Sequence, residues 1–244
     1  MRSEVRAQMR TQELMAHSGR LPQLSRNSLS KAAGARLLET YADLARRGEH
    51  LFSELLAGET PTQWSHYPED DAIDHGSGFQ WFYHSHSPED RPDSSEHGHI
   101  HLFAHRKLWF RRLRSARELE FAALAENSHE SASTRHLLCI SFDAKGIPTS
   151  LFTVNSWVTG DLMLSAPTTV AILDRITLET GHKEVDTVVE CIVKLYRAEI
   201  QDLLHARDAR LMGRSKPSVL LDESLEVLSE LFIQLDSKLN GLAV

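Results

Sequence analysis

The spacing of hydrophobic residues changes along the chain from helical to alternating and back to helical. Over residues 28–56 they recur every three or four positions, which predicts an amphipathic helix of about thirty residues that Gly58 would end. Gly34 and Gly48 are weak points within it. Residues 1–27 carry no such stripe, so we expect a flexible or loosely docked arm followed by a single domain over residues 28–244.

Four segments in the middle of the chain alternate in polarity or are rich in aromatic and β-branched residues, as strands are. These segments are residues 79–86, 97–103, 136–142 and 149–157. A turn at Asp143–Gly146 would join the last two as a hairpin. Residues 59–78 are rich in Pro, Gly, Asp and Ser and indicate a loop, and a short helix is expected near residues 115–126.

Helical spacing returns after Gly160 and predicts three more helices. They would cover about residues 166–180, 185–204 and 225–239. The fold class is therefore α+β. We expect an antiparallel sheet of about four strands, with the N-terminal helix and three C-terminal helices packed on one face. The other face is then left to carry polar groups.

Histidines concentrate on two of the predicted strands. The chain has fourteen, and eight of them lie between residues 66 and 105. Alternate side chains of a strand share a face, so His97, His99 and His101 point the same way, as do His84 and His86. If His84 opposes His99, all five imidazoles share one face, together with Phe82. A slip of one residue would separate the two sets. We favour the shared face.

Three imidazoles that converge on one point can hold a divalent transition metal such as zinc, iron or manganese. The predicted ligands come from His84, His86, His97, His99 and His101. A carboxylate from Glu96 or Glu89 would favour iron or manganese. The alternative is a wet strand face that is merely rich in histidine. The remaining histidines, His136 among them, are expected to be surface or locally hydrogen-bonded residues, and Cys139 and Cys191 to be buried, inert thiols.

Two short motifs resemble known families. The stretch from His97 to Phe103, His-Gly-His-Ile-His-Leu-Phe, resembles the signature of the histidine-triad nucleotide hydrolases and transferases. That resemblance implies that His99 is a metal-independent nucleophile, and Arg106 and Lys107 would then hold a phosphate. His84-Ser-His86, followed by Glu89 and Asp90, resembles the first metal-binding motif of cupins, but the second cupin motif has no counterpart.

A third resemblance covers more of the chain. GFQWFYHSH, EHGHIHLF and GIPTSLFTVNSWVTGD, in this order, resemble a bacterial family known as a domain of unknown function. The resemblance implies that Asn155 and Trp157 share a functional surface with the histidines and contact a small-molecule ligand. The alternative is that Asn155 satisfies local backbone groups and Trp157 anchors the core.

Composition and charge exclude some classes of function but do not identify one. The net charge of −7 argues against a nucleic-acid partner, although residues 106–117 carry six Lys or Arg with interleaved aromatics. No apolar run is long enough to cross a membrane, so we expect a cytoplasmic protein. Three functions stay open: a metal-binding protein or metal-dependent enzyme, a histidine-nucleophile phosphoryl hydrolase or transferase, and a non-catalytic ligand-binding or interaction module.

Overall fold

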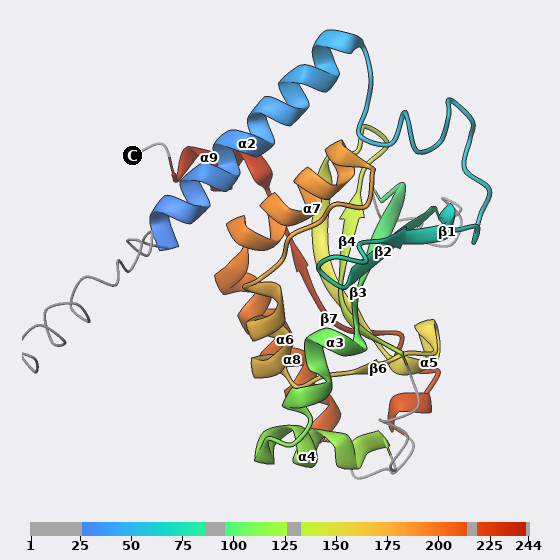
Figure 1. Cartoon of the computed structure of the whole chain (residues 1–244), viewed down its shortest axis with the longest axis vertical. Coiled ribbons are helices and arrows are strands. Elements are labelled where there is room, and N and C mark those ends of the chain that lie inside the picture. Colours follow the sequence, from blue (N-terminus) through green and yellow to red (C-terminus); the bar gives the residue numbers. More distant parts are fainter. Residues whose placement is uncertain (1–25, 86–95, 126–132, 214–218, 243–244) are drawn as a thin grey trace, which may run out of the picture.

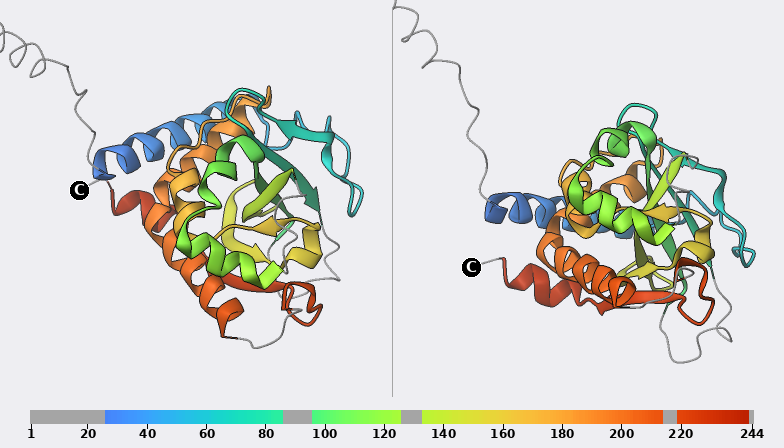
Figure 2. Two further views of the ribbon diagram at one scale, coloured as in Figure 1. Left: turned by 60° about the horizontal axis from the view of Figure 1, so that its bottom comes forward. Right: turned by 90° about the horizontal axis from the view of Figure 1, so that it is seen from below.

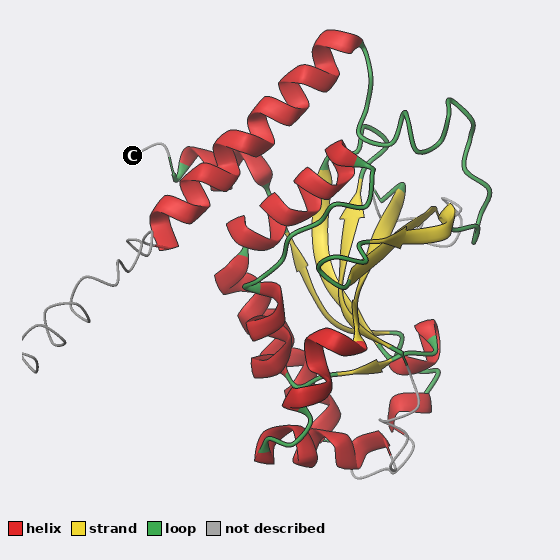
Figure 3. Cartoon of the chain, in the orientation of Figure 1, coloured by secondary structure: helices red, strands yellow, loops and turns green. Residues whose placement is uncertain are grey.

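The structure is a computed structural model and describes residues 26–85, 96–125, 133–213 and 219–242. A layer of helices lies against one side of a twisted β-sheet (Figures 1 and 3). This arrangement confirms the predicted α+β class. The predicted N-terminal arm lies, except for its last two residues, outside the described part of the chain.

Six strands follow one another across the sheet, each antiparallel to its neighbours. They are β1 (Tyr67–Ile73), β2 (Phe79–Ser85), β3 (Gly98–His105), β4 (Thr134–Phe142), β5 (Pro148–Val154) and β7 (Val227–Phe232). The short strand β6 (Leu162–Met163) pairs in parallel with β4. The sheet therefore has seven strands, and the prediction of about four was too low. β1 was expected to be loop because its sequence, YPEDDAI, is mostly polar, which an edge strand tolerates.

The helical layer consists of α2 (Arg26–Arg47), α6 (Ala166–Leu173), α7 (Lys183–Leu195) and α8 (Arg197–Met212). Four shorter helices complete the described part of the chain: α3 (Arg106–Trp109), α4 (Ala116–Ala122), α5 (Ser156–Thr159) and α9 (Leu235–Asn240). Short 3₁₀ turns cover Phe110–Arg112, Ala123–Ala125 and Val219–Leu221. Figure 2 shows from two further sides that the long helices stay on the same side of the sheet.

All four of the long predicted helices differ from the structure in extent or in kind. The first ends at Arg47 and not near residue 56, because Gly48 adopts a left-handed conformation with φ of 70°. The helix predicted over residues 225–239 is instead β7 followed by the short α9. The spacing of the leucines in this segment is compatible with a helix or a strand. Pairing with β5 stabilises the strand. In addition, Tyr196 divides the predicted helix 185–204 into α7 and α8, and α6 stops at Leu173.

The pairing of β2 with β3 confirms the favoured register. His84 lies opposite His99, and Phe82 lies opposite His101. The alternate residues of the two strands, such as Trp81 and Tyr83, point to the helices and belong to the main hydrophobic core. The histidine face is therefore the side of the sheet away from the helices.

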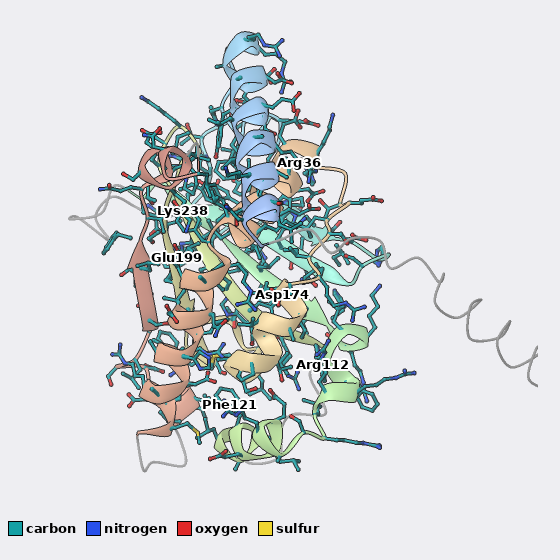
Figure 4. All side chains as sticks on the ribbon, turned by 90° about the vertical axis from the view of Figure 1, so that its left-hand side faces the viewer. Arg36, Arg112, Phe121, Asp174, Glu199 and Lys238 are labelled. Carbon is teal, nitrogen blue, oxygen red and sulfur yellow. The ribbon has the colours of Figure 1, made fainter. Side chains whose placement is uncertain are left out.

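Polar contacts hold the helical layer together. Arg36 of α2 donates to Glu190 of α7 at 3.0 Å, and Lys238 of α9 forms an ion pair with Glu199 of α8 (Figure 4). On the inner side of α7, Asp186 accepts a hydrogen bond from Nε1 of Trp81 at 2.8 Å. This last contact ties the helical layer to β2.

Candidate metal centre

Three imidazoles converge on the histidine face of the sheet. Nε2 of His99 lies 2.8 Å from Nε2 of His84 and 2.9 Å from Nε2 of His101. All three ligand atoms lie within 4.8 Å of one another. His84 comes from β2, whereas His99 and His101 are alternate residues of β3. The site is thus fixed by one hairpin register, and a rigid sheet holds it.

The spacing of these atoms fits a metal ion. Nitrogen ligands about 2.0–2.1 Å from one ion stand about 2.9 Å apart at right angles and about 3.3 Å apart in a tetrahedron. The observed 2.8 and 2.9 Å approach the first of these separations. Each of the two observed separations needs to grow by only a few tenths of an ångström to reach the tetrahedral value.

The carboxylate of Glu96 contacts the central imidazole, His99, on the nitrogen that faces away from the other two histidines. Nδ1 of His99 donates to Oε1 of Glu96 at 2.5 Å, and Oε2 of Glu96 accepts from the Ser141 hydroxyl at 2.9 Å. Both the His99 and the Glu96 side chains are almost fully buried. When Glu96 accepts the Nδ1 proton, Nε2 of His99 is the nitrogen left to face the other two imidazoles. This carboxylate–histidine pairing is the usual support of a metal-binding imidazole.

A second group of ligand atoms adjoins the first. Nδ1 of His101 lies 3.2 Å from Nε2 of His136, and Sγ of Cys139 lies 3.3 Å from each of these nitrogens. Residues three apart in a regular strand point to opposite faces. A bulge in β4, where Leu102 pairs with Leu138 but Phe103 pairs with His136, brings His136 and Cys139 to the same face.

Burial keeps the deeper imidazoles neutral. It lowers the pKa of His101 well below its ordinary value, and the neighbouring imidazoles lower it further. Burial, with the positive charge of Arg207, lowers the pKa of His136 to about 3. Both rings are therefore unprotonated at neutral pH, which is the form that binds metal.

Aromatic side chains surround the imidazoles. Phe82 lies 5.0 Å from the ring of His101, and Phe152 meets the ring of His99 edge-on at 5.0 Å. His84 is the most exposed of the three at 9%, and the exposed Trp64 lies 6.0 Å from its ring. The histidine face is thus buried among aromatic side chains, and it is not the wet strand face of the alternative interpretation.

The other candidate residues that the structure describes lie apart from this convergence. Nδ1 of His97 lies 2.9 Å from the hydroxyl of Tyr83, whose ring belongs to the helix-facing core. His86 and Glu89 lie outside the described residues. Lys107 donates to the carbonyls of His75 and Gly76, and Arg106 stacks over Phe110.

Asn155 and Trp157 contact backbone groups of the segment that leads to β7. Asn155 caps α5 by accepting from the Ser156 amide, and it donates to the carbonyl of Val219. Nε1 of Trp157 donates to the carbonyl of Leu225. The sequence reasoning missed His136, Cys139 and Ser141 as members of the site, since only the bulge and the pairing of β3 with β4 place them there.

The fold and the site define an α+β protein with buried imidazole and thiol groups positioned to hold a metal ion. The chain belongs to the family described as Domain of unknown function (DUF6969), whose model matches residues 31–233. The predicted resemblance to an uncharacterised family is thereby confirmed. Neither the curated proteins nor the solved structures yielded a significant match. Within the described residues, every helix is too short or too polar for a bilayer span.

Proposed function

We propose that the protein binds a divalent transition metal, zinc, iron or manganese, through Nε2 of His84, His99 and His101. The convergence of these three nitrogens at 2.8 and 2.9 Å, with the central one supported by Glu96, carries the proposal. The same contacts can be imidazole–imidazole hydrogen bonds when no ion is bound, and metal analysis distinguishes the two states.

The surrounding residues prepare the imidazoles for this role. Glu96 fixes the tautomer of His99, and Ser141 in turn orients Glu96. The Ser150 hydroxyl extends this chain, 3.0 Å from the Ser141 oxygen and 3.3 Å from the exposed Glu230. It thus connects the site with the surface and supplies a route by which a proton can reach or leave Glu96.

Three protein ligands leave coordination positions for water or a substrate, which distinguishes a catalytic from a structural site. We therefore propose a metal-dependent enzyme that acts on a small molecule. A bound ion would lower the pKa of a coordinated water or polarise a substrate oxygen. In this scheme His84, His99 and His101 hold the ion, and Glu96 orients His99. Asn155, Trp157, Arg106 and Lys107 are not part of the proposed centre.

The geometry favours this function over a metal-free histidine nucleophile. In a histidine-triad mechanism Nε2 of His99 attacks phosphorus, but here two imidazole nitrogens stand within 2.9 Å of that atom. A nucleophile requires open space in front of the attacking lone pair. A metal ligand requires the opposite, namely further donors around the same point.

Elemental analysis of untagged protein, purified without chelator and then reconstituted, tests the proposal. We expect a stoichiometric transition metal in the wild type and at least one equivalent less in the double variant His84→Ala/His99→Ala, which removes two ligands of this centre. His205→Ala, which removes an exposed histidine on α8, is the matched control and should keep the metal. Absence of metal from the reconstituted wild type, or equal metal content in the double variant, would overturn the proposal.

A further inference from the structure

The thiol of Cys139 has no part in the three-histidine centre, yet it is fully buried against two imidazole nitrogens. Its sulfur lies 3.3 Å from Nδ1 of His101 and 3.3 Å from Nε2 of His136. The exposed fractions of Cys139, His101 and His136 are 0%, 1% and 1%. Three ligand atoms of the types that bind transition metals are therefore gathered at one enclosed point.

The separations suit a single ion. In a tetrahedral site with bonds of about 2.0–2.1 Å to nitrogen and about 2.3 Å to sulfur, two nitrogens stand about 3.3 Å apart and nitrogen stands about 3.6 Å from sulfur. The observed values are 3.2 Å between the nitrogens and 3.3 Å from each nitrogen to sulfur. The group needs only a small movement of the thiol to reach the geometry of such a site.

We propose that His101, His136 and Cys139 form a second metal site beside the three-histidine centre. The imidazole of His101 belongs to both sites, because its Nε2 faces His99 and its Nδ1 faces His136. The inference rests on the proposed function only where it calls His101 shared. The second site is complete in its own three ligands and needs no ion in the first.

The ligand set selects the kind of ion. One thiolate with two imidazoles favours thiophilic ions such as zinc or copper(I) over magnesium, calcium or manganese. Binding replaces the thiol proton of Cys139, which leaves to solvent. If both sites were filled, His101 would lose its remaining ring proton to solvent and would be an imidazolate shared by the two sites.

The second site differs from the first in a property that can be observed directly. The three-histidine centre has only nitrogen donors, so cobalt(II) bound there gives d–d bands in the visible region alone. Cobalt(II) bound by Cys139 gives in addition a thiolate-to-metal charge-transfer band in the near ultraviolet. A hydrogen-bonded cluster without an ion, in which the thiol donates to an imidazole nitrogen, gives no such band.

Cobalt(II) titration of the metal-free full-length protein is therefore the test. We expect the wild type to show the charge-transfer band and to take up a second equivalent of cobalt. Cys139→Ser should lose that band and that equivalent, while it keeps the d–d bands of the first site. His136→Gln should behave in the same way, and circular dichroism verifies that both variants fold. Cys191→Ser, which removes the other buried thiol, should match the wild type.

His84→Ala separates this inference from the proposed function. It removes a ligand of the first site alone, so the charge-transfer band should persist. A band in the wild type together with no cobalt bound by Cys139→Ser would sink the three-histidine centre and leave the second site standing. A wild type without the band, or a band of equal strength in Cys139→Ser, would overturn the second site whatever the first one binds.

Discussion

Nδ1 of His99 lies 2.5 Å from Oε1 of Glu96, and both side chains are almost completely shielded from solvent. This contact sets which nitrogen of His99 carries the proton, and so it sets which nitrogen faces His84 and His101. Glu96 precedes the first residue of β3 by two positions. The contact therefore ties the end of the β2–β3 connection to β3.

Glu96→Gln should weaken metal binding without removing any of the three imidazoles. The amide is uncharged and supports the Nδ1–H of His99 less well, and loss of such a supporting carboxylate typically costs roughly 10- to 100-fold in metal affinity. Competition with a chromogenic chelator measures the change. Glu230→Gln, at the exposed end of the same hydrogen-bonded chain, is the control and should bind as the wild type does. Equal affinity of Glu96→Gln and wild type would contradict the assigned role.

Gly98 lies between two histidines at the start of β3, where β2 approaches closely. A Cβ atom there would stand 2.4 Å from the Tyr83 hydroxyl and 2.5 Å from the carbonyl of His84. The backbone of His84 cannot yield without moving its imidazole. We expect Gly98→Ala to destabilise the fold by about 1–3 kcal/mol and to weaken metal binding as well.

Urea unfolding and a metal titration on the same variant test both effects. Gly241→Ala is the matched control, since a Cβ atom there meets only ordinary contacts at 3.5 Å. A Gly98→Ala protein as stable as the wild type would show that the two strands have more room than the structure gives them.

The sequence favoured a shared face for His84, His99 and His101, among five candidate histidines, because side-chain direction along a strand repeats every two residues. His99 and His101 alternate, and the length of the hairpin connection makes it possible for His84 to oppose His99. The same rule gives no sign of the second group, because His136 and Cys139 are three residues apart and share a face only through the bulge in β4. Nothing in the local sequence marks a bulge that arises from pairing with a neighbouring strand.

The errors in the fold have a similar cause. β7 and α9 were merged into one predicted helix, since leucines spaced by three and four suit both structures until β5 supplies a partner. β1 has too few apolar residues to be recognised, and its strand form depends on pairing with β2. Tertiary pairing, which local spacing does not encode, decided both segments.

Asp186→Ala should destabilise the protein although Asp186 lies on the helical side of the sheet. Its carboxylate accepts from Nε1 of the fully buried Trp81 at 2.8 Å and from the amide and hydroxyl of Thr180 at 2.8 Å each. Truncation leaves these donors without their acceptor, at a cost of about 2–3 kcal/mol. Urea unfolding monitored by tryptophan fluorescence measures it. The exposed Asp202→Ala on α8 should change stability by less than about 0.5 kcal/mol, and a similar loss in both variants would contradict the prediction.

The metal-free protein should lose stability as the pH falls below about 6.5. The ordinary pKa of histidine is 6.5, whereas burial and Arg207 lower that of His136 to about 3 in the folded chain. Between these values the unfolded chain binds a proton that the native chain does not, so the free energy of unfolding rises with pH across the window. The contribution of His136 to the free energy of unfolding is complete above about pH 6.5 and is lost as the pH falls to about 3. The lowered pKa of His101 adds a contribution of the same sign.

The upper part of this window isolates the histidines. Asp74 and Glu190 also have lowered pKa values, but these carboxyls begin from 3.8 and 4.5 and exchange protons at lower pH. Urea midpoints measured from pH 7 to pH 5 on the metal-free protein should therefore fall with pH in the wild type and fall less steeply in His136→Gln. Bound metal should make the urea midpoint depend more steeply on pH, because protons compete with the ion for the same imidazole nitrogens. Parallel pH profiles for the wild type and His136→Gln would mean that His136 is accessible to protons in the folded chain.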